Sequence, residues 1–152
     1  MNQNQLGNYY EDFNVGEEIY HTLSKTVFES DNNLFCLLTM NNHPVHTNVD
    51  YASKAQHGKI LVVGTLVFSL VVGITVPDIS GKAIANLDYE NIKHLAPTFI
   101  GDTIYARTRV IDKRESKSKF DRGIIYVETI GYNQEGLDVI SFRRHVLVPK
   151  KV

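Results

Sequence analysis

The 152-residue sequence has little of three things that would narrow its function at once: cysteine, net charge and long apolar runs. Its single cysteine, Cys36, excludes an internal disulfide framework and a cysteine-based zinc cluster. The 16 Lys and Arg against 17 Asp and Glu give a net charge of −1, which does not support a nucleic-acid-binding protein. The length predicts one domain over residues 1–152, which is large enough to bury a hydrophobic core without disulfide bonds.

No segment of the chain predicts a secretory leader or a membrane span. Met1–Tyr10 is polar and lacks the apolar stretch of a secretory signal. Ile60–Val76 is an uncharged segment at the lower length limit for a membrane span. It contains glycine, serine and threonine, so we expect a helix buried in a soluble core. The expectation is therefore a cytoplasmic protein with no membrane partner.

The order of the expected elements predicts an α+β fold. Glu17–Glu29 has the composition of a strand, the polar residues Ser30–Asn33 begin a helix that ends before Pro44, and Asn48 begins a second short helix. The apolar helix follows, and Pro77 is expected to end it. Four segments rich in β-branched and aromatic residues come next, over 83–95, 102–112, 123–132 and 138–148. A turn joins the last two into a hairpin, so we expect helices on one face of an antiparallel sheet.

Two places in the chain are candidates for chemistry. His43 and His46 flank Pro44, which could present a ring nitrogen at a fixed angle; the alternative is a polar connection that satisfies turn backbone groups. No cysteine or carboxylate stands nearby at ligand spacing, so we expect no metal. Gly64 begins the apolar helix, where free N–H groups could hold a carbonyl oxygen; the alternative is close packing of the helix against a strand.

The residues at both places resemble those of the MaoC-like, (R)-specific enoyl-CoA hydratase family. The resemblance rests on DNNLFCLLTMNNHPVH at 31–46, Gly64, IKHLAPTFIGDTI at 92–104 and SFRRHVLVPK at 141–150. It implies the hot-dog fold, in which a curved antiparallel sheet wraps a long central helix. It also implies a homodimer that acts on a small-molecule acyl-CoA and needs no cofactor, because the CoA thioester is the substrate.

The resemblance assigns roles to individual residues. His46 matches the catalytic histidine, which acts on the water added to the double bond, and Gly64 matches the glycine whose N–H polarises the thioester carbonyl. Asn41 stands where the family has an aspartate that shares this water. We expect further substrate contacts from His43, Pro44, Val63, Thr65 and Ser69.

Asn41 leaves three possibilities open, because an amide can hold a water but cannot accept its proton. His46 is the sole base and Asn41 orients the water, or a carboxylate such as Asp50 or Asp88 replaces the aspartate, or the chain is not an active hydratase. The third possibility corresponds to a non-catalytic acyl-CoA-binding subunit.

Two motifs are similar to the branch that hydrates short branched or dicarboxylic C4–C5 acyl-CoA esters, such as mesaconyl-, itaconyl- and β-methylmalyl-CoA. They are Asn-x-His-Pro-x-His and the later Phe-Arg-Arg-x-Val-Leu-Val-Pro. A second substrate carboxylate needs a cation or donor, for which His43 or an arginine of the sheet is the candidate. A hot-dog thioesterase is the alternative enzyme, although Ile60–Val76 lacks the carboxylate that such an enzyme generally needs. The surplus of basic residues over 112–122 is either a contact for the CoA phosphates or a solvated loop.

Overall fold

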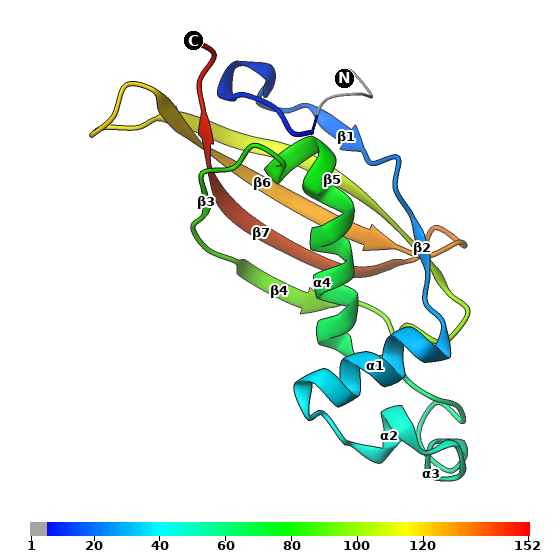
Figure 1. Cartoon of the computed structure of the whole chain (residues 1–152). Helices are drawn as coiled ribbons and strands as arrows, with labels where there is room; N and C mark the ends of the chain where they lie inside the picture. The colour runs from blue at the N-terminus through cyan, green and yellow to red at the C-terminus, as the bar shows by residue number, and fades with distance from the viewer. Residues whose placement is uncertain (1–5) are drawn as a thin grey trace.

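The fold is a curved antiparallel sheet that wraps one long helix, α4 (Figure 1). The computed structural model describes residues 6–152, so the first five residues of the Met1–Tyr10 segment lie outside it. The strands are β1 (Glu18–Tyr20), β2 (Lys25–Thr26), β3 (Ala85–Asn86), β4 (Glu90–His94), β5 (Thr103–Glu115), β6 (Arg122–Tyr132) and β7 (Asp138–Pro149). The helical elements are η1 (Tyr10–Asp12), α1 (Glu29–Thr39), α2 (Pro44–Thr47), α3 (Val49–Ser53), α4 (Gly64–Thr75) and the π-helical turn η2 (Val76–Ser80). The predicted α+β hot-dog arrangement is confirmed.

The sheet is built on the long antiparallel strands β5, β6 and β7, in the order β1-β5-β6-β7-β3, with β2 on β5 and β4 on β7. Buried and half-buried residues alternate strictly along β6, so every second side chain enters the core. The expected hairpin between β6 and β7 is present, and Asn133 holds its turn by accepting N–H bonds from Glu135 and Leu137.

Helix α4 is less completely buried than its apolar sequence predicts. Val67, Val71 and Ile74 enter the core at helical spacing, but Thr65 and Ser69 lie exposed on the opposite side. The helix begins at Gly64, as expected, and ends at Thr75 before the proline, which lies inside η2.

The expected strand at Glu17–Glu29 is wrong as a single element. It forms β1 and β2, because the His21 ring turns inward between them and hydrogen-bonds both Asp78 and the Thr108 hydroxyl at 2.7 Å. Helix α1 begins at Glu29 instead of after the polar run. Asp31 caps it from inside the first turn by accepting the Phe28 N–H at 2.9 Å.

Polar side chains divide the core into two apolar clusters. Along β5 and β7, Thr108 and Arg144 stand between residues of one cluster and residues of the other, and Thr108 shares a 2.8 Å hydrogen bond with Thr129 of β6. Arg144 is buried and donates to the Thr75 hydroxyl of α4 at 2.7 Å. This layer fixes where α4 meets the sheet.

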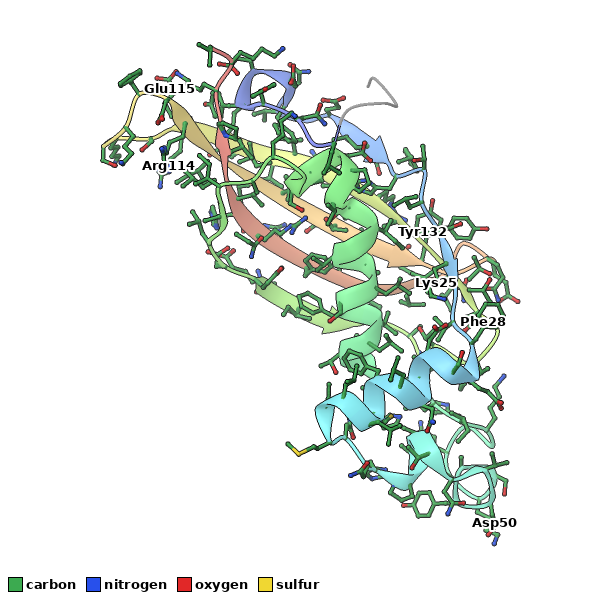
Figure 2. The ribbon with its side chains drawn as sticks, viewed as in Figure 1. Lys25, Phe28, Asp50, Arg114, Glu115 and Tyr132 are labelled. Atoms are coloured by element: carbon green, nitrogen blue, oxygen red, sulfur yellow. The ribbon has the colours of Figure 1, made fainter. Side chains whose placement is uncertain are left out.

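Helices α1 to α3 lie beyond one end of the sheet, next to the N-terminus of α4, and the β5–β6 connection lies at the other end (Figure 1). Figure 2 shows the separation by its labels, with Asp50 at one end and Arg114 and Glu115 at the other. The basic segment is thus remote from the α4 N-terminus of the same chain. Among residues 6–152, no helix has the length and apolarity to cross a membrane.

Candidate active site

His46 is held in one orientation by the chain that leads into α4. Its Nδ1 lies 2.6 Å from the carbonyl oxygen of Leu61, and a carbonyl oxygen only accepts. Nδ1 therefore carries the proton, and in the neutral ring Nε2 is left with a free lone pair. The half-buried imidazole is thus oriented to accept a proton at Nε2.

The buried side chain of Asn32 joins His46 to the start of α4. Its amide nitrogen donates to the His46 carbonyl at 3.0 Å, and its amide oxygen accepts the N–H of Val63 at 3.0 Å. The orientation of this amide is fixed, because one partner can only accept and the other can only donate. Asn32 is 2% exposed and sits on α1, so one side chain ties three segments together.

The N-terminus of α4 presents unused donors. No hydrogen bond from the N–H of Gly64 or Thr65 occurs within residues 6–152, as is usual in the first turn of a helix. These groups and the positive end of the helix dipole favour an oxygen that carries negative charge. The arrangement suits a carbonyl that gains charge during a reaction.

Two cavities flank the segment that leads into α4. One, of about 260 Å³, is lined by His46 and Asn32 together with Glu29 and other residues of α1. The other, of about 480 Å³, is lined by Gly64, His94 and mostly apolar residues. Ile60 lines the first cavity and Leu61 the second, so the chain between α3 and α4 contributes to both.

The structure places the other predicted residues of the histidine segment as follows. Pro44 begins α2, and His43 caps it, because its ring Nδ1 accepts the Val45 N–H at 3.1 Å. The His43 and His46 rings lie edge to face with centroids 6.0 Å apart. Asn41 follows α1, and no hydrogen bond joins its side chain to His46 among the described residues.

The predicted contacts on α4 separate into two groups. Val63 is buried and acts through its backbone N–H to Asn32. Thr65 and Ser69 lie on the exposed side of α4 and do not line the cavity at Gly64. In the single chain, hydrogen bonds through Asn32 and Leu61 therefore connect His46 to the segment that contains Val63 and Gly64. The side chains of Thr65 and Ser69 take no part in this connection.

Neither carboxylate considered as a substitute for the family aspartate forms a hydrogen bond or ion pair with His46 among the described residues. Asp50 is exposed on α3 and pairs with Lys54 at 3.0 Å, and Asp88 pairs with His145 at 2.9 Å. Asp88, Glu90 and His145 are the one group of three potential metal-binding side chains among the described residues, and they already bond one another and Tyr126. The histidines of the candidate site do not belong to this group.

Sequence reasoning missed Asn32 and His94. Both residues lie in segments that carry the family resemblance, but the resemblance assigns them no role. Asn32 is expected only to help begin a helix, and nothing in its local pattern shows that it is buried with two distant backbone partners. The place of His94 beside Gly64 depends on how β4 pairs with β7.

The comparisons with known proteins identify the family of the chain. The family model described as mesaconyl-CoA hydratase matches residues 1–152. Mesaconyl-CoA hydratase from Cereibacter sphaeroides is 37% identical over 95% of this chain and 42% of its own length. The β-methylmalyl-CoA dehydratase from Chloroflexus aurantiacus is 34% identical over 95% of this chain and 41% of its own length.

A solved structure from Chloroflexus aurantiacus, a putative MaoC domain protein dehydratase, superposes with a TM-score of 0.91 at 34% identity. The match covers 96% of this chain and 41% of that one. The chain thus spans about two fifths of the length of the curated relatives named above. Since the family model covers the whole sequence, the chain belongs to the mesaconyl-CoA hydratase family.

Proposed function

We propose that the chain adds water to the double bond of a 2-enoyl-CoA thioester, or removes it in the reverse direction. The observation that carries this proposal is the hydrogen bond from His46 Nδ1 to the Leu61 carbonyl. It leaves Nε2 to act as the base, and its partner Leu61 belongs to the segment that leads into α4, whose N-terminal donors suit the thioester oxygen. The reaction requires no cofactor besides the CoA thioester that is its substrate.

In the proposed mechanism, the thioester oxygen accepts the Gly64 N–H and the acyl group extends along Leu61 towards His46. His46 Nε2 removes a proton from a water whose oxygen attacks the β-carbon, and that proton is returned to the α-carbon. The Gly64 N–H stabilises the charge that develops on the thioester oxygen, an effect of about 3–4 kcal/mol for one such donor. Asn41 is assigned to orient the water with its amide.

The proposed substrates are short branched or dicarboxylic C4–C5 acyl-CoA esters, such as mesaconyl-, itaconyl- or β-methylmalyl-CoA. The family match and the names of the two relatives support this class. A largely apolar cavity of about 480 Å³ at Gly64 is compatible with a short acyl group.

A second copy of the chain is proposed to complete the site, because the relatives are more than twice as long as the matched segment. Helix α1 presents an apolar surface that a partner would cover, formed by Leu34, Leu37 and Leu38, each more than half exposed. Light scattering should give the mass of a dimer or a higher homo-oligomer. A monomer that is fully active would contradict this part of the proposal.

The test replaces His46 by alanine and follows mesaconyl-CoA and crotonyl-CoA by the absorbance of the double bond. Loss of a general base should lower kcat by about 10²–10⁴-fold. His145→Gln is the control, because this histidine pairs with Asp88 away from both cavities and should leave kcat unchanged. Unchanged turnover in the His46 variant would refute the assignment.

The same assay separates the other functions. A thioesterase would release free CoA as the substrate disappears, and a non-catalytic subunit would bind the thioester without turnover. The first turn of α4 contains no acidic residue, which favours hydration over hydrolysis.

A further inference from the structure

The imidazole of His94 lies directly against Gly64. A methyl group added at Gly64 would stand 2.7 Å from Cε1 and 2.9 Å from Nε2 of His94. Both residues line the same cavity, and His94 is exposed to solvent in the single chain. A polar ring with at least one N–H donor therefore stands next to the donors of the α4 N-terminus.

The rest of this cavity is suited to an anion on a short apolar chain. Its described lining residues include no aspartate or glutamate, and most of them are apolar. The Thr98 hydroxyl oxygen belongs to a lining residue that is 3% exposed, and it has no hydrogen-bond partner among the described residues. A buried hydroxyl without a partner is uncommon in native proteins and is expected to serve a water or a ligand.

A dicarboxylic C4 acyl group has its second carboxylate only two carbon atoms from the thioester carbonyl. The side chain that recognises this carboxylate must therefore adjoin the group that polarises the carbonyl. We infer that His94 is the residue that selects a dicarboxylic acyl group, by donating a hydrogen bond to its second carboxylate while Gly64 holds the thioester oxygen. This inference rests on the proposed function, whose substrate class it makes specific.

His43, the earlier candidate for this role, is placed less well. Its Nδ1 is engaged by the backbone of α2, and it lines neither cavity. The buried Arg144 of β7 is also excluded, because its guanidinium donates to Thr75 at the far end of α4. His57 also lines the cavity, but its ring lies against Phe99, with centroids 5.5 Å apart. His94 is the imidazole that stands in contact range of Gly64.

The experiment compares His94→Phe with the wild type on two substrates that differ only at the distal group. Mesaconyl-CoA carries a carboxylate where tiglyl-CoA carries a methyl group. Loss of a hydrogen bond to a charged group should lower kcat/KM for mesaconyl-CoA by about 10- to 100-fold. The value for tiglyl-CoA should stay the same or rise. Lys93→Gln is the control, since it removes a cation from the neighbouring residue, which lies in a different cavity.

Binding of saturated thioesters tests the inference even if the chain proves inactive. Methylsuccinyl-CoA and 2-methylbutyryl-CoA are the matched pair, and calorimetry gives the dissociation constants. The wild type and Lys93→Gln should prefer the dicarboxylic ester, and His94→Phe should lose this preference. Equal losses for both esters, or an unchanged preference in His94→Phe, would overturn the role of His94. Absence of turnover by the wild type with the preference intact would instead overturn the proposed function alone.

Discussion

Replacement of Asn32 by leucine tests the link between His46 and α4. The two side chains have similar sizes, so the substitution removes the hydrogen bonds to the His46 carbonyl and the Val63 N–H without creating a large cavity. Since the residue is buried, both backbone groups would be left with no partner.

The expected cost follows from these two unpaired groups. Each buried group without a partner costs about 1–3 kcal/mol, so the free energy of unfolding should fall by about 2–6 kcal/mol. For a domain of this size each kcal/mol lowers Tm by about 2–4 °C, so a decrease of roughly 4–24 °C is expected. Because Asn32 reaches His46 through its backbone, kcat should fall by about tenfold or more while KM changes little.

Calorimetry for Tm and steady-state kinetics on mesaconyl-CoA measure the two effects separately. Asn14→Leu is the matched control, because Asn14 is exposed and makes one side-chain hydrogen bond of 3.4 Å, to Glu17. A normal kcat in an Asn32→Leu protein with reduced Tm would refute the positioning role. An unchanged Tm would refute the stability reasoning itself.

Substitutions at three further residues test other parts of the structure. Asn41→Asp should raise kcat severalfold if Asn41 holds the attacking water, and unchanged hydration kinetics would place the water elsewhere. Burial lowers the pKa of His21 despite its bond to Asp78, so the unfolded chain binds the proton more tightly. Unfolding free energy measured in urea should therefore decrease as pH falls from about 7.5 to 5.5, and His21→Gln should flatten that slope. Burial also lowers the pKa of Arg144, whose guanidinium donates to the neutral side chains of Asn86 and Thr75. Arg144→Met should therefore keep stability within about 1 kcal/mol or raise it, whereas Arg144→Ala should cost more by leaving a cavity.

Elements with a local signal could be predicted from the sequence, and those set by distant contacts could not. The hairpin after β6 was predicted because its turn chemistry lies within four consecutive residues, Asn133 to Gly136. The break between β1 and β2 was missed because it depends on the bond between His21 and Asp78, which are 57 residues apart. The predicted start of helix α1 was too late in the sequence. Asp31 caps the helix from its third residue, whereas a capping residue was expected to stand before the first turn.

The candidate site divides in the same way. His46 and Gly64 stand in segments whose residue order alone drew attention to them. The orientation of the His46 ring depends on its hydrogen bond to the Leu61 carbonyl. The direction of that carbonyl depends in turn on the path of the chain into α4. His43 illustrates the risk of proximity in sequence: it is three residues from His46, yet it caps α2 and lines neither cavity.

The position of His94 depends on one extra residue in β4. Glu90 pairs with Arg143 and Lys93 pairs with Ser141, so three steps along β4 match two steps along β7. Asn91 absorbs the difference in the left-handed region, at φ 51°. As a result His94 pairs with Ile140, whose side chain is fully buried.

Without this bulge, Lys93 would pair with Ile140. Each side chain at the end of β4 would then lie on the opposite face of the sheet, because a shift of one residue exchanges the two faces of a strand. The cavity at Gly64 would then hold a lysine, and the imidazole would lie on the outer face of the sheet. A long, flexible ammonium carries charge but does not fit closely against a glycine as a planar ring does. The bulge at Asn91 therefore determines that an imidazole stands beside Gly64, which is the placement that the proposed selection of a dicarboxylic acyl group requires.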